Sequence, residues 1–428
     1  MLFIFMDELF LKYIWKFKLL KFPLILENGE LLEIINTGTE NFDSGPDFIN
    51  AMIKTGTTKW VGNLEIHIKS SDWFKHGHHK DHAYDNVILH IVYENDINVF
   101  DASYQQILTF CISKFIPNNI YDNYLNFCKS KSWIPCEKNI KFLPEQNIIV
   151  KNYLTRLSIE RYERKLSFFL AEIASLKNDW EEYFYRLLGK SFGFSVNSLS
   201  FYRLTCITPL KLLIKEGSSV FALEALLYGQ AGLINSSLHD EYPRKLLLHY
   251  QHLANKHKLT SMNKHEWNFL RIRPTGFPTI RISQFANLLQ AAYPIFRAII
   301  ESKTDDIIKL FEQTSSEYWN NHFCFDKKAS NYFIKKLSIA AITSILINSV
   351  VPALFTYGHY MKDLKIKQKA LDILYALPAE DNKIIRKWGA NGIKALNAAD
   401  SQGLIELKTM YCNVKNCLKC TLGYYFLK

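Results

Sequence analysis

The feature that most constrains the fold is a change of hydrophobic period near residue 140. Before it, short β-branched and aromatic runs alternate with glycine and proline turns, and Val87 to Tyr93 is dense enough for a central strand. After it, apolar residues recur at helical spacing, as from Ile148 to Leu157. With 428 residues, 48% of them hydrophobic, the chain can bury more than one core. The pattern predicts an α+β protein with a mixed α/β domain at 1–138, a larger all-α domain at 139–400 and a cysteine-bearing tail at 401–428.

Both parts can be divided further by periodicity and turn signals. In the first part we expect helices at 7–20 and 80–85, strands at 29–36, 48–53, 60–68 and 87–93, and edge strands at 98–100 and 106–112. In the second part we expect helices at 147–176, 182–190, 209–215, 219–229, 244–256, 283–302, 304–314, 327–351, 365–376 and 383–389.

The net charge is +11 and the pI is near 9.0. A basic balance of this size is compatible with a polyanionic partner, of which DNA or RNA is the commonest. A solvated basic surface is the plainer alternative. Only 22% of residues are charged, so the composition does not indicate disorder.

Two apolar segments bear on where in the cell the protein is located. The apolar start Met1–Phe5 is followed by Asp7 and Glu8, where a signal peptide would stay hydrophobic, so we expect a cytoplasmic protein with reduced thiols. The strongest membrane candidate, Leu337 to Phe355, contains Asn348 and Pro352, which favours a buried core helix over a membrane span.

Two carboxylates are predicted to meet across a β-hairpin. If the chain turns at Gly56, the antiparallel strands place Asp47 opposite residues 65 to 67. Side chains alternate along a strand, so Glu65, His67 and Lys69 face one side of the sheet, and Asp47 can join them. Two carboxylates, an imidazole and an ammonium group then share one patch.

Such a patch suits a hard divalent ion, because Mg²⁺ (or Mn²⁺) binds oxygen ligands and needs only one or two carboxylates. Asp47 and Glu65 would hold the ion, and Glu8 could reach it from the first helix. Lys69 or His67 would orient the attacking water or stabilise developing charge. The plainer alternative is a surface salt-bridge network in which Glu65 pairs with Lys69.

This order of elements resembles the PD-(D/E)XK nuclease superfamily over about a quarter of the chain. Pro46-Asp47 stands for its Pro-Asp motif, and Glu65-Ile66-His67 stands for its Glu-x-Lys motif. His67 occupies the position of the motif lysine, and Lys69 comes two residues later. The resemblance implies a restriction-endonuclease-like core and metal-dependent hydrolysis of phosphodiesters.

Over its whole length the chain is similar to a bacterial family catalogued only as domain of unknown function 2851, which brings no established activity. The stretches that carry this similarity are Gly45–Phe48, Glu65–Trp73, Val87–Val92, Glu224–Gly232, Arg273–Arg281 and the terminal cysteines.

Histidines and arginines add candidate contacts. A histidine-rich loop could hold Zn²⁺ or another transition metal, or could contact phosphate through His76 and His78; its other polar members are His79, Asp81 and His82. Arg271, Arg273 and Arg281 bracket a rigid turn and are candidate nucleic-acid contacts. Salt bridges from these arginines to Glu224 or Glu266 are the alternative.

The tail contains three closely spaced thiols in the pattern Cys412-x₄-Cys417-x₂-Cys420. A metal site with four thiolate ligands would need one more cysteine, which Cys136 or Cys324 could supply. Certain PD-(D/E)XK nucleases use an iron–sulfur staple of similar layout, and Zn²⁺ fits equally well. Reduced cysteines packed as small hydrophobic residues are the alternative.

Together these patterns predict a metal-dependent nuclease or other nucleic-acid-processing protein. A non-catalytic nucleic-acid-binding or scaffold protein with a degenerate site is the main alternative. Hydrolysis of another phosphate ester, with the histidine-rich loop as its metal site, is a third possibility.

Overall fold

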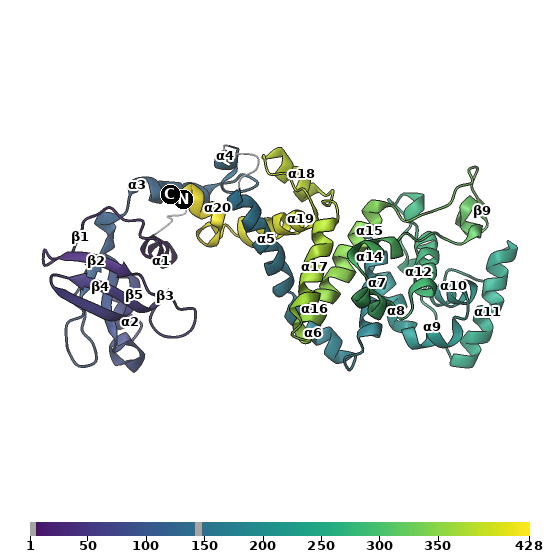
Figure 1. Cartoon of the computed structure of the whole chain (residues 1–428), viewed down its shortest axis with the longest axis horizontal. Helices are drawn as coiled ribbons and strands as arrows, with labels where there is room; N and C mark the ends of the chain where they lie inside the picture. The colour runs from purple at the N-terminus through teal and green to yellow at the C-terminus, as the bar shows by residue number, and fades with distance from the viewer. Residues whose placement is uncertain (1–5, 142–147) are drawn as a thin grey trace. The chain divides into compact units, whose positions relative to one another are not determined.

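The computed structural model describes residues 6–141 and 148–428, so the apolar start at Met1–Phe5 and the first predicted helical residue, Asn147, lie outside the described part. The chain forms two compact units, coloured by residue number in Figure 1. The first comprises Met1–Pro144 and Lys408–Lys428, and the second comprises Glu145–Leu407. An N-terminal sheet and a helical region confirm the predicted α+β class. The predicted separate tail is instead part of the first unit from Lys408 onward, because its apolar side chains are buried there.

The first unit is built on a mixed sheet with strand order β1-β2-β4-β5-β6-β7, in which β3 pairs with β4. Antiparallel pairing joins β1 to β2, β2 to β4, and β4 to β5, whereas β6 runs parallel to both β5 and β7. The strands are β1 (Leu24–Ile25), β2 (Leu31–Asn36), β3 (Thr39–Glu40), β4 (Phe48–Thr55), β5 (Thr58–Lys69), β6 (Val87–Glu94) and β7 (Thr109–Cys111).

The hairpin of β4 and β5 turns at Gly56, as the sequence predicts, since Thr55 pairs with Thr58. Its register shifts between Phe48 and Ala51, where Asn50 has a φ of 57°. This β-bulge inserts one extra residue into β4, and an unpaired residue re-aims the side chains beyond it. Without it, Asp47 would lie opposite Ile66 and face away from Glu65.

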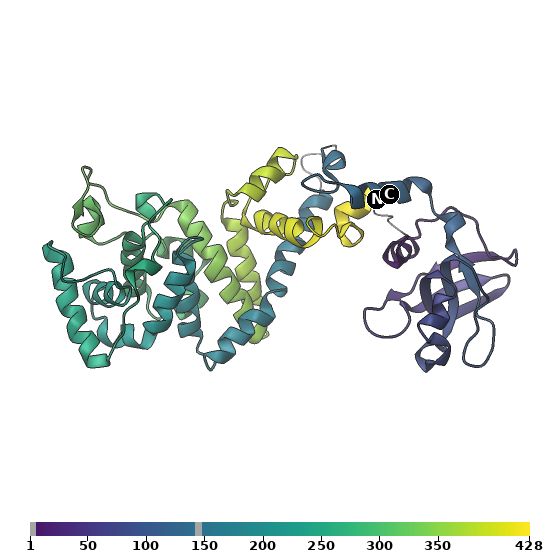
Figure 2. The ribbon, with the colours of Figure 1, turned by 180° about the vertical axis from the view of Figure 1, so that it is seen from behind.

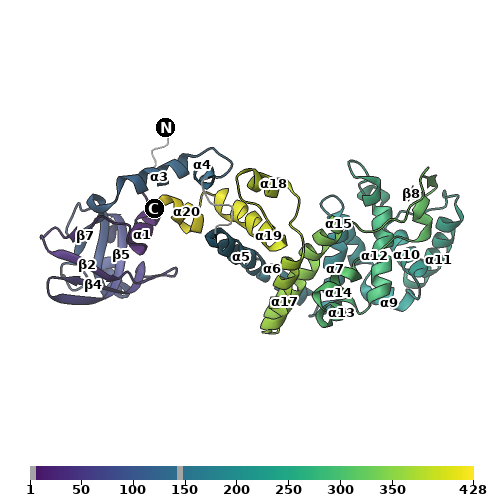
Figure 3. The same ribbon diagram turned by 45° about the horizontal axis from the view of Figure 1, so that its top comes forward.

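The first unit also contains five helices in its described part, of which α1 and α2 pack on β5; Figure 3 shows α1 beside the sheet. The helices are α1 (Glu8–Lys16), α2 (Asp72–Lys75), α3 (Asn118–Lys129), α4 (Glu137–Ile140) and α20 (Thr421–Leu427). The short helix predicted at 80–85 is wrong: the segment forms 3₁₀ turns at His78–Lys80 and His82–Tyr84. The side chain of Asp81 accepts a hydrogen bond from the Ala83 amide, a local turn that competes with an α-helix.

The second unit is helical and is seen from behind in Figure 2. Its apolar residues form one large core. The helices are α5 (Ile148–Glu163), α6 (Leu166–Ser175), α7 (Trp180–Phe192), α8 (Ser198–Ile207), α9 (Leu210–Glu216), α10 (Val220–Gln230), α11 (Glu241–His257), α12 (Pro278–Ala292), α13 (Ile295–Glu301), α14 (Thr304–Leu310), α15 (Ile339–Ile345), α16 (Val351–Tyr360), α17 (Leu364–Ala376), α18 (Lys383–Ala390) and α19 (Ala398–Glu406), with a small hairpin of β8 (His322–Cys324) and β9 (Lys327–Lys328).

Three of the predicted helices differ from the structure. The helix predicted at 147–176 is interrupted after Glu163 and forms α5 and α6. The helix predicted at 283–302 begins earlier, at Pro278, and is broken before Pro294, because proline disfavours the α conformation in the residue that precedes it. The helix predicted at 327–351 begins only at Ile339, where the hydroxyl of Ser338 caps it by accepting from the Ala341 amide.

One helical stretch, Ile339–Tyr360, is long and apolar enough to cross a membrane, with a mean hydropathy of 1.9. It comprises α15, a π-helical segment and α16. Because 78% of its most apolar window is buried, its composition is also that of a core helix.

Candidate metal site

Asp47 and Glu65 meet on one face of the hairpin. The Asp47 amide donates to Oε2 of Glu65 at 3.0 Å, and the Ile66 amide donates to Oδ2 of Asp47 at 3.1 Å. These reciprocal hydrogen bonds hold both carboxylates in place. The side chains are 14% and 7% exposed, respectively, so both carboxylates are largely removed from water.

A lysine from α1 completes this part of the site. The Asp7 side chain caps the helix by accepting from the Phe10 amide, and Glu8 lies in its first turn. One turn later, Nζ of Lys12 lies 2.5 Å from Oδ1 of Asp47. Both oxygens of Asp47 therefore have donors, one from Lys12 and one from the backbone.

The remaining oxygen of the pair, Oε1 of Glu65, faces a cluster of imidazoles. Nε2 of His67 and Nε2 of His78 each lie 3.4 Å from it. His76 joins the cluster, since its Nδ1 lies 3.0 Å from Nε2 of His67. One nitrogen from each of the three histidines lies within 4.8 Å of the other two. Among the residues that the structure describes, these are the three ligand atoms brought this close together.

A fourth histidine orients the first. Nδ1 of His67 lies 2.9 Å from Nε2 of His90 on the neighbouring strand β6, and His90 is fully buried. The ring of Trp73 packs against His78 and His90 at centroid distances of 5.3 Å. A hydrogen bond to the second ring nitrogen fixes the orientation of a metal-binding imidazole, so His90 is a positioning residue for His67.

Burial controls the charge of these groups. It lowers the pKa of His67 to about 2 and that of His90 to about 3, and the neighbouring imidazoles act in the same direction. Burial also raises the pKa of Glu65 and of Asp47, which His78 and Lys12 respectively oppose. Near neutral pH, His67 and His90 are thus uncharged, and neutral imidazole is the form that binds metals.

This arrangement differs in its ligands from the oxygen site that the sequence indicates. One carboxylate oxygen and three imidazole nitrogens form a mixed N/O set, which suits Zn²⁺, Fe²⁺, Ni²⁺ or Mn²⁺ better than Mg²⁺. The four candidate ligands, one glutamate and three histidines, are of the chemical type that such an ion binds, because they combine nitrogen donors of intermediate softness with one anionic oxygen.

The other residues predicted for this site are placed differently. Nζ of Lys69 lies 3.1 Å from Oε1 of Glu94, and this ammonium group contacts neither carboxylate of the pair. Glu8 lies near enough for the charge of Asp47 to contribute to a raised pKa, although burial is the main cause. In the histidine-rich loop, His82 is directed to Asp85 at 2.9 Å and His79 packs against Phe74.

The arginines predicted to contact nucleic acid have unlike surroundings. Arg271 and Arg273 are exposed. The guanidinium group of Arg281 lies over the ring of Phe194 at 4.8 Å and donates to Gln284, and burial lowers its pKa to about 10. The alternative salt bridges do not form in the described part of the chain: Glu224 accepts from Ser316 and Tyr242, and Glu266 pairs with Arg203.

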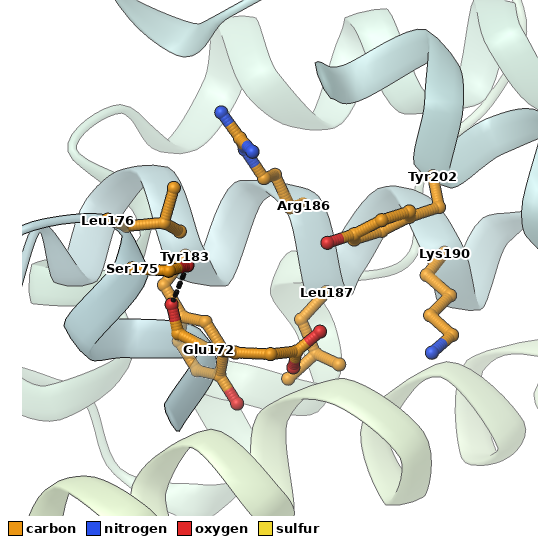
Figure 4. A pocket seen from close by; sticks show the side chains of 8 residues that line it. All are labelled: Glu172, Ser175, Leu176, Tyr183, Arg186, Leu187, Lys190 and Tyr202. Carbon is orange, nitrogen blue, oxygen red and sulfur yellow. Dashed lines mark hydrogen bonds between the residues drawn. The ribbon is translucent and has the colours of Figure 1, made fainter. Parts of the chain in front are cut away.

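Two hollows in the helical unit do not suit a phosphate substrate. One is a cavity of about 30 Å³ beside Glu172, Arg186 and Lys190, shown in Figure 4, which has room for ordered water only. The other is a groove of about 640 Å³ whose walls include Glu224 and Glu317, and none of the described residues lining it is Lys or Arg. The carboxylate–histidine cluster therefore remains the best candidate for chemistry.

The cysteines predicted to bind metal all lie in the first unit, and Cys324, the alternative fourth ligand, belongs to the second. Cys136, Cys412, Cys417 and Cys324 form no disulfide in the described part of the chain.

Fold and side chains together define an α+β chain with a buried carboxylate–histidine cluster on its N-terminal sheet. The chain belongs to the family described as protein of unknown function DUF2851, whose model matches residues 8–383. The match contains every residue of the cluster but ends before the terminal cysteines. No curated protein and no solved structure shows a significant match.

Two features of the site, the contact of Lys12 with Asp47 and the orienting role of His90, are not among those predicted from the sequence. For Lys12 a signal existed, because Glu8 and Lys12 are four residues apart and share one face of a helix. For His90 the signal was its position in the middle of an apolar strand, which identifies a buried imidazole but not its partner.

Proposed function

We propose that the first unit binds a divalent transition-metal ion through Glu65, His67, His76 and His78 and uses it to hydrolyse phosphodiester bonds in DNA or RNA. The observation that carries the proposal is a buried carboxylate, Glu65, with two imidazoles 3.4 Å from its Oε1 and a third imidazole, His76, 3.0 Å from that of His67. A buried carboxylate without a permanent cation beside it is costly, and a bound metal ion removes that cost.

The other residues of the site have roles that fit this chemistry. A bound divalent ion polarises the phosphoryl group and lowers the pKa of a bound water. Asp47 holds Glu65 through its amide and keeps Lys12 at the edge of the site. From that position Lys12 stabilises the negative charge of a phosphate group.

Nucleic acid is the proposed substrate because of the net charge of +11, which favours a polyanion. The order of elements, with α1 beside an antiparallel β4–β5 hairpin and β6 parallel to β5, supports a restriction-endonuclease-like core as part of this proposal. The metal of the proposal is Mn²⁺, Fe²⁺, Ni²⁺ or Zn²⁺, with Mg²⁺ less suited to the nitrogen ligands.

The test is cleavage by the full-length protein of single- and double-stranded DNA, of RNA and of the generic diester bis(p-nitrophenyl) phosphate, each with Mn²⁺, Zn²⁺ or Mg²⁺. We expect Glu65→Gln and His67→Ala to lose on the order of 100-fold or more in rate, because each removes a ligand. Lys69→Ala and His82→Ala are matched controls from the same strand and loop, and they should keep the wild-type rate, since both side chains point elsewhere.

Equal cleavage by all variants would contradict the proposal. Binding of nucleic acid without cleavage by any protein would instead support the non-catalytic binding or scaffold function. Activity on the generic diester alone would replace nucleic acid by another phosphate ester as the substrate.

A further inference from the structure

A second cluster of metal-binding side chains lies outside the carboxylate–histidine site. It consists of Cys136, the residue before α4, and of three cysteines in the segment that leads to α20. These three are Cys412, Cys417 and Cys420. All four belong to the first unit, although the whole helical unit separates the first of them from the other three in the sequence. Cys136, Cys417 and Cys420 are buried.

Contacts within the first unit bring the C-terminal segment to Cys136. Nζ of Lys408, one helical turn before Cys412, donates to the carbonyl of Trp133 at 2.8 Å. On the other side of the segment, the ring of Tyr424 packs against Phe17 of the N-terminal region at 4.6 Å. The segment is thus held at its start beside Trp133, three residues before Cys136, and near its end on Phe17.

The chain also turns tightly between the last two cysteines. The Cys420 amide donates to the Cys417 carbonyl at 3.2 Å, so the two residues close a single 3₁₀ turn. Gly423 packs directly on this turn, because a Cβ atom there would lie 2.0 Å from the Cys417 carbonyl oxygen. Such a turn presents two thiols from neighbouring positions, as metal sites with a Cys-x₂-Cys pair do.

The thiols lie within electrostatic reach of one another. Burial is the main cause of the raised pKa of Cys136, which is about 12, and the nearby thiols of Cys420 and Cys417 contribute to it. The pKa of Cys412 is also raised, first by burial and then by Cys420, Cys136 and Cys417. These mutual effects place the four thiols near one another, with Cys136, Cys417 and Cys420 buried and Cys412 half-buried.

We propose that Cys136, Cys412, Cys417 and Cys420 form a thiolate-ligated metal centre that fastens the segment Lys408–Lys428 to the rest of the first unit. The centre is separate from the proposed hydrolytic site in residues and in ligand type. Soft thiolates select Zn²⁺ or iron–sulfur clusters, and both would use these four residues as ligands.

The experiment is elemental analysis for zinc, iron and sulfide, with a visible absorption spectrum, on the full-length protein purified without oxygen or chelators. We expect about one centre per chain, with iron, sulfide and visible absorption for a cluster, or zinc alone for a single ion. Cys136→Ser and Cys417→Ser should each lower the metal content several-fold, whereas Cys206→Ser and Cys324→Ser, from the helical unit, should leave it unchanged.

A second measurement on the wild type avoids dependence on variants that fail to fold. Removing the metal should expose four more thiols to a thiol reagent and make Lys408–Lys428 the first segment cut by a protease. Glu65→Gln should keep the thiolate metal, so failure of the hydrolytic site and failure of this centre are distinguishable. A folded wild-type protein with no bound zinc or iron, or with the same content in the Cys136 and Cys417 variants, would overturn the proposal.

Discussion

Two buried glutamates in this chain show how the partner of a carboxylate determines its role. Glu406, in the helical unit, is fully buried and receives bidentate hydrogen bonds from Arg164 and a further one from Arg161. Its charge is balanced by permanent cations. Glu65 faces imidazoles, of which His67 is uncharged near neutral pH. The charge of Glu406 is therefore balanced within the protein, whereas the charge of Glu65 is not balanced by its imidazole neighbours and favours a bound cation.

The arginine partners of Glu406 lie at the end of α5. Arg161 belongs to this helix, and Arg164 follows it directly. In the structure they are bound to Glu406, and Arg161 also donates to Gln402 at 2.7 Å. These two guanidinium groups join α5 to α19, so they contribute to stability.

At this scale we predict that Glu406→Gln lowers the free energy of unfolding of the helical unit by about 3 kcal/mol at pH 7, since it leaves two arginines without their partner. Burial alone would raise the pKa of Glu406, but Arg164 and Arg161 outweigh it and hold the pKa below its usual range. A lowered carboxyl pKa stabilises the fold above the unfolded pKa and ceases to do so as the pH falls through the folded value. The difference between the two proteins should therefore shrink below about pH 4.

Denaturant titration at several pH values measures this difference. The matched control is Glu301→Gln, which breaks the exposed pair of Arg297 and Glu301, whose side chains are 73% and 63% exposed. An exposed pair contributes at most about 1 kcal/mol, so the control should change little. Similar losses from both variants would show that the burial of Glu406 has no special effect.

Among the elements, the β-bulge in β4 decides whether the site exists. Asn50 adopts a left-handed conformation at its φ of 57°, and its amide donates to Oδ1 of Asn63 at 3.3 Å. Glycine and asparagine adopt this conformation readily, while β-branched residues do not. The orientation of Asp47 toward Glu65 depends on this one backbone position.

We predict that Asn50→Gly keeps the stability of the first unit and its metal affinity, whereas Asn50→Val lowers stability by about 1–3 kcal/mol because of backbone strain. If Asn50→Val refits the hairpin without the bulge, Asp47 turns away from Glu65 and metal affinity falls as well. Thermal unfolding and metal titration of the two variants check this. Unchanged behaviour of Asn50→Val would show that the bulge does not need this residue.

A second element-scale prediction concerns the packing of α19 on α5. At Gly403 an added Cβ would lie 2.4 Å from the Leu154 carbonyl oxygen, so Gly403→Ala must push the helices apart, with a loss of about 1–3 kcal/mol. At Gly389 in α18, nothing lies within 4 Å, and Gly389→Ala should gain up to about 1 kcal/mol from helix propensity. Chemical denaturation should give shifts of opposite sign, and equal signs would contradict the close approach.

For the whole molecule, the division into two units predicts that metal acts on one of them. Ligands that bind only the folded state stabilise it, by about 2.7 kcal/mol at a hundred times the Kd. Mn²⁺ or Zn²⁺ added to chelated protein should therefore raise the melting temperature of the first unit and leave the transition of the helical unit in place. Calorimetry resolves this, and Glu65→Gln together with Cys136→Ser should abolish the shift. A uniform shift of one single transition would contradict two independent units.

How much of the molecule can be read from the sequence depends on the range of the interactions. The change of period near residue 140, the strand at 87–94 and the turn at Gly56 follow from local patterns, and the structure confirms them. The prediction of a helix at 327–351 was wrong for its first part, because the structure has a helix only from Ile339. Before it, Lys335 donates a hydrogen bond to the carbonyl of Trp319, a distant contact that no local pattern reveals. Local propensity yields to such distant partners.

The sequence by itself determined the α+β class, the β-hairpin and the residue types that any metal site here would use, because all of these depend on neighbours within a few positions. Only the tertiary structure decided which of them meet. It placed Lys12 rather than Lys69 on Asp47, brought His78 to Glu65 and His76 to His67, and set Cys136 near the C-terminal cysteines. Side chains from distant segments come together only when burial of apolar surface packs their elements, and no short-range pattern encodes that packing.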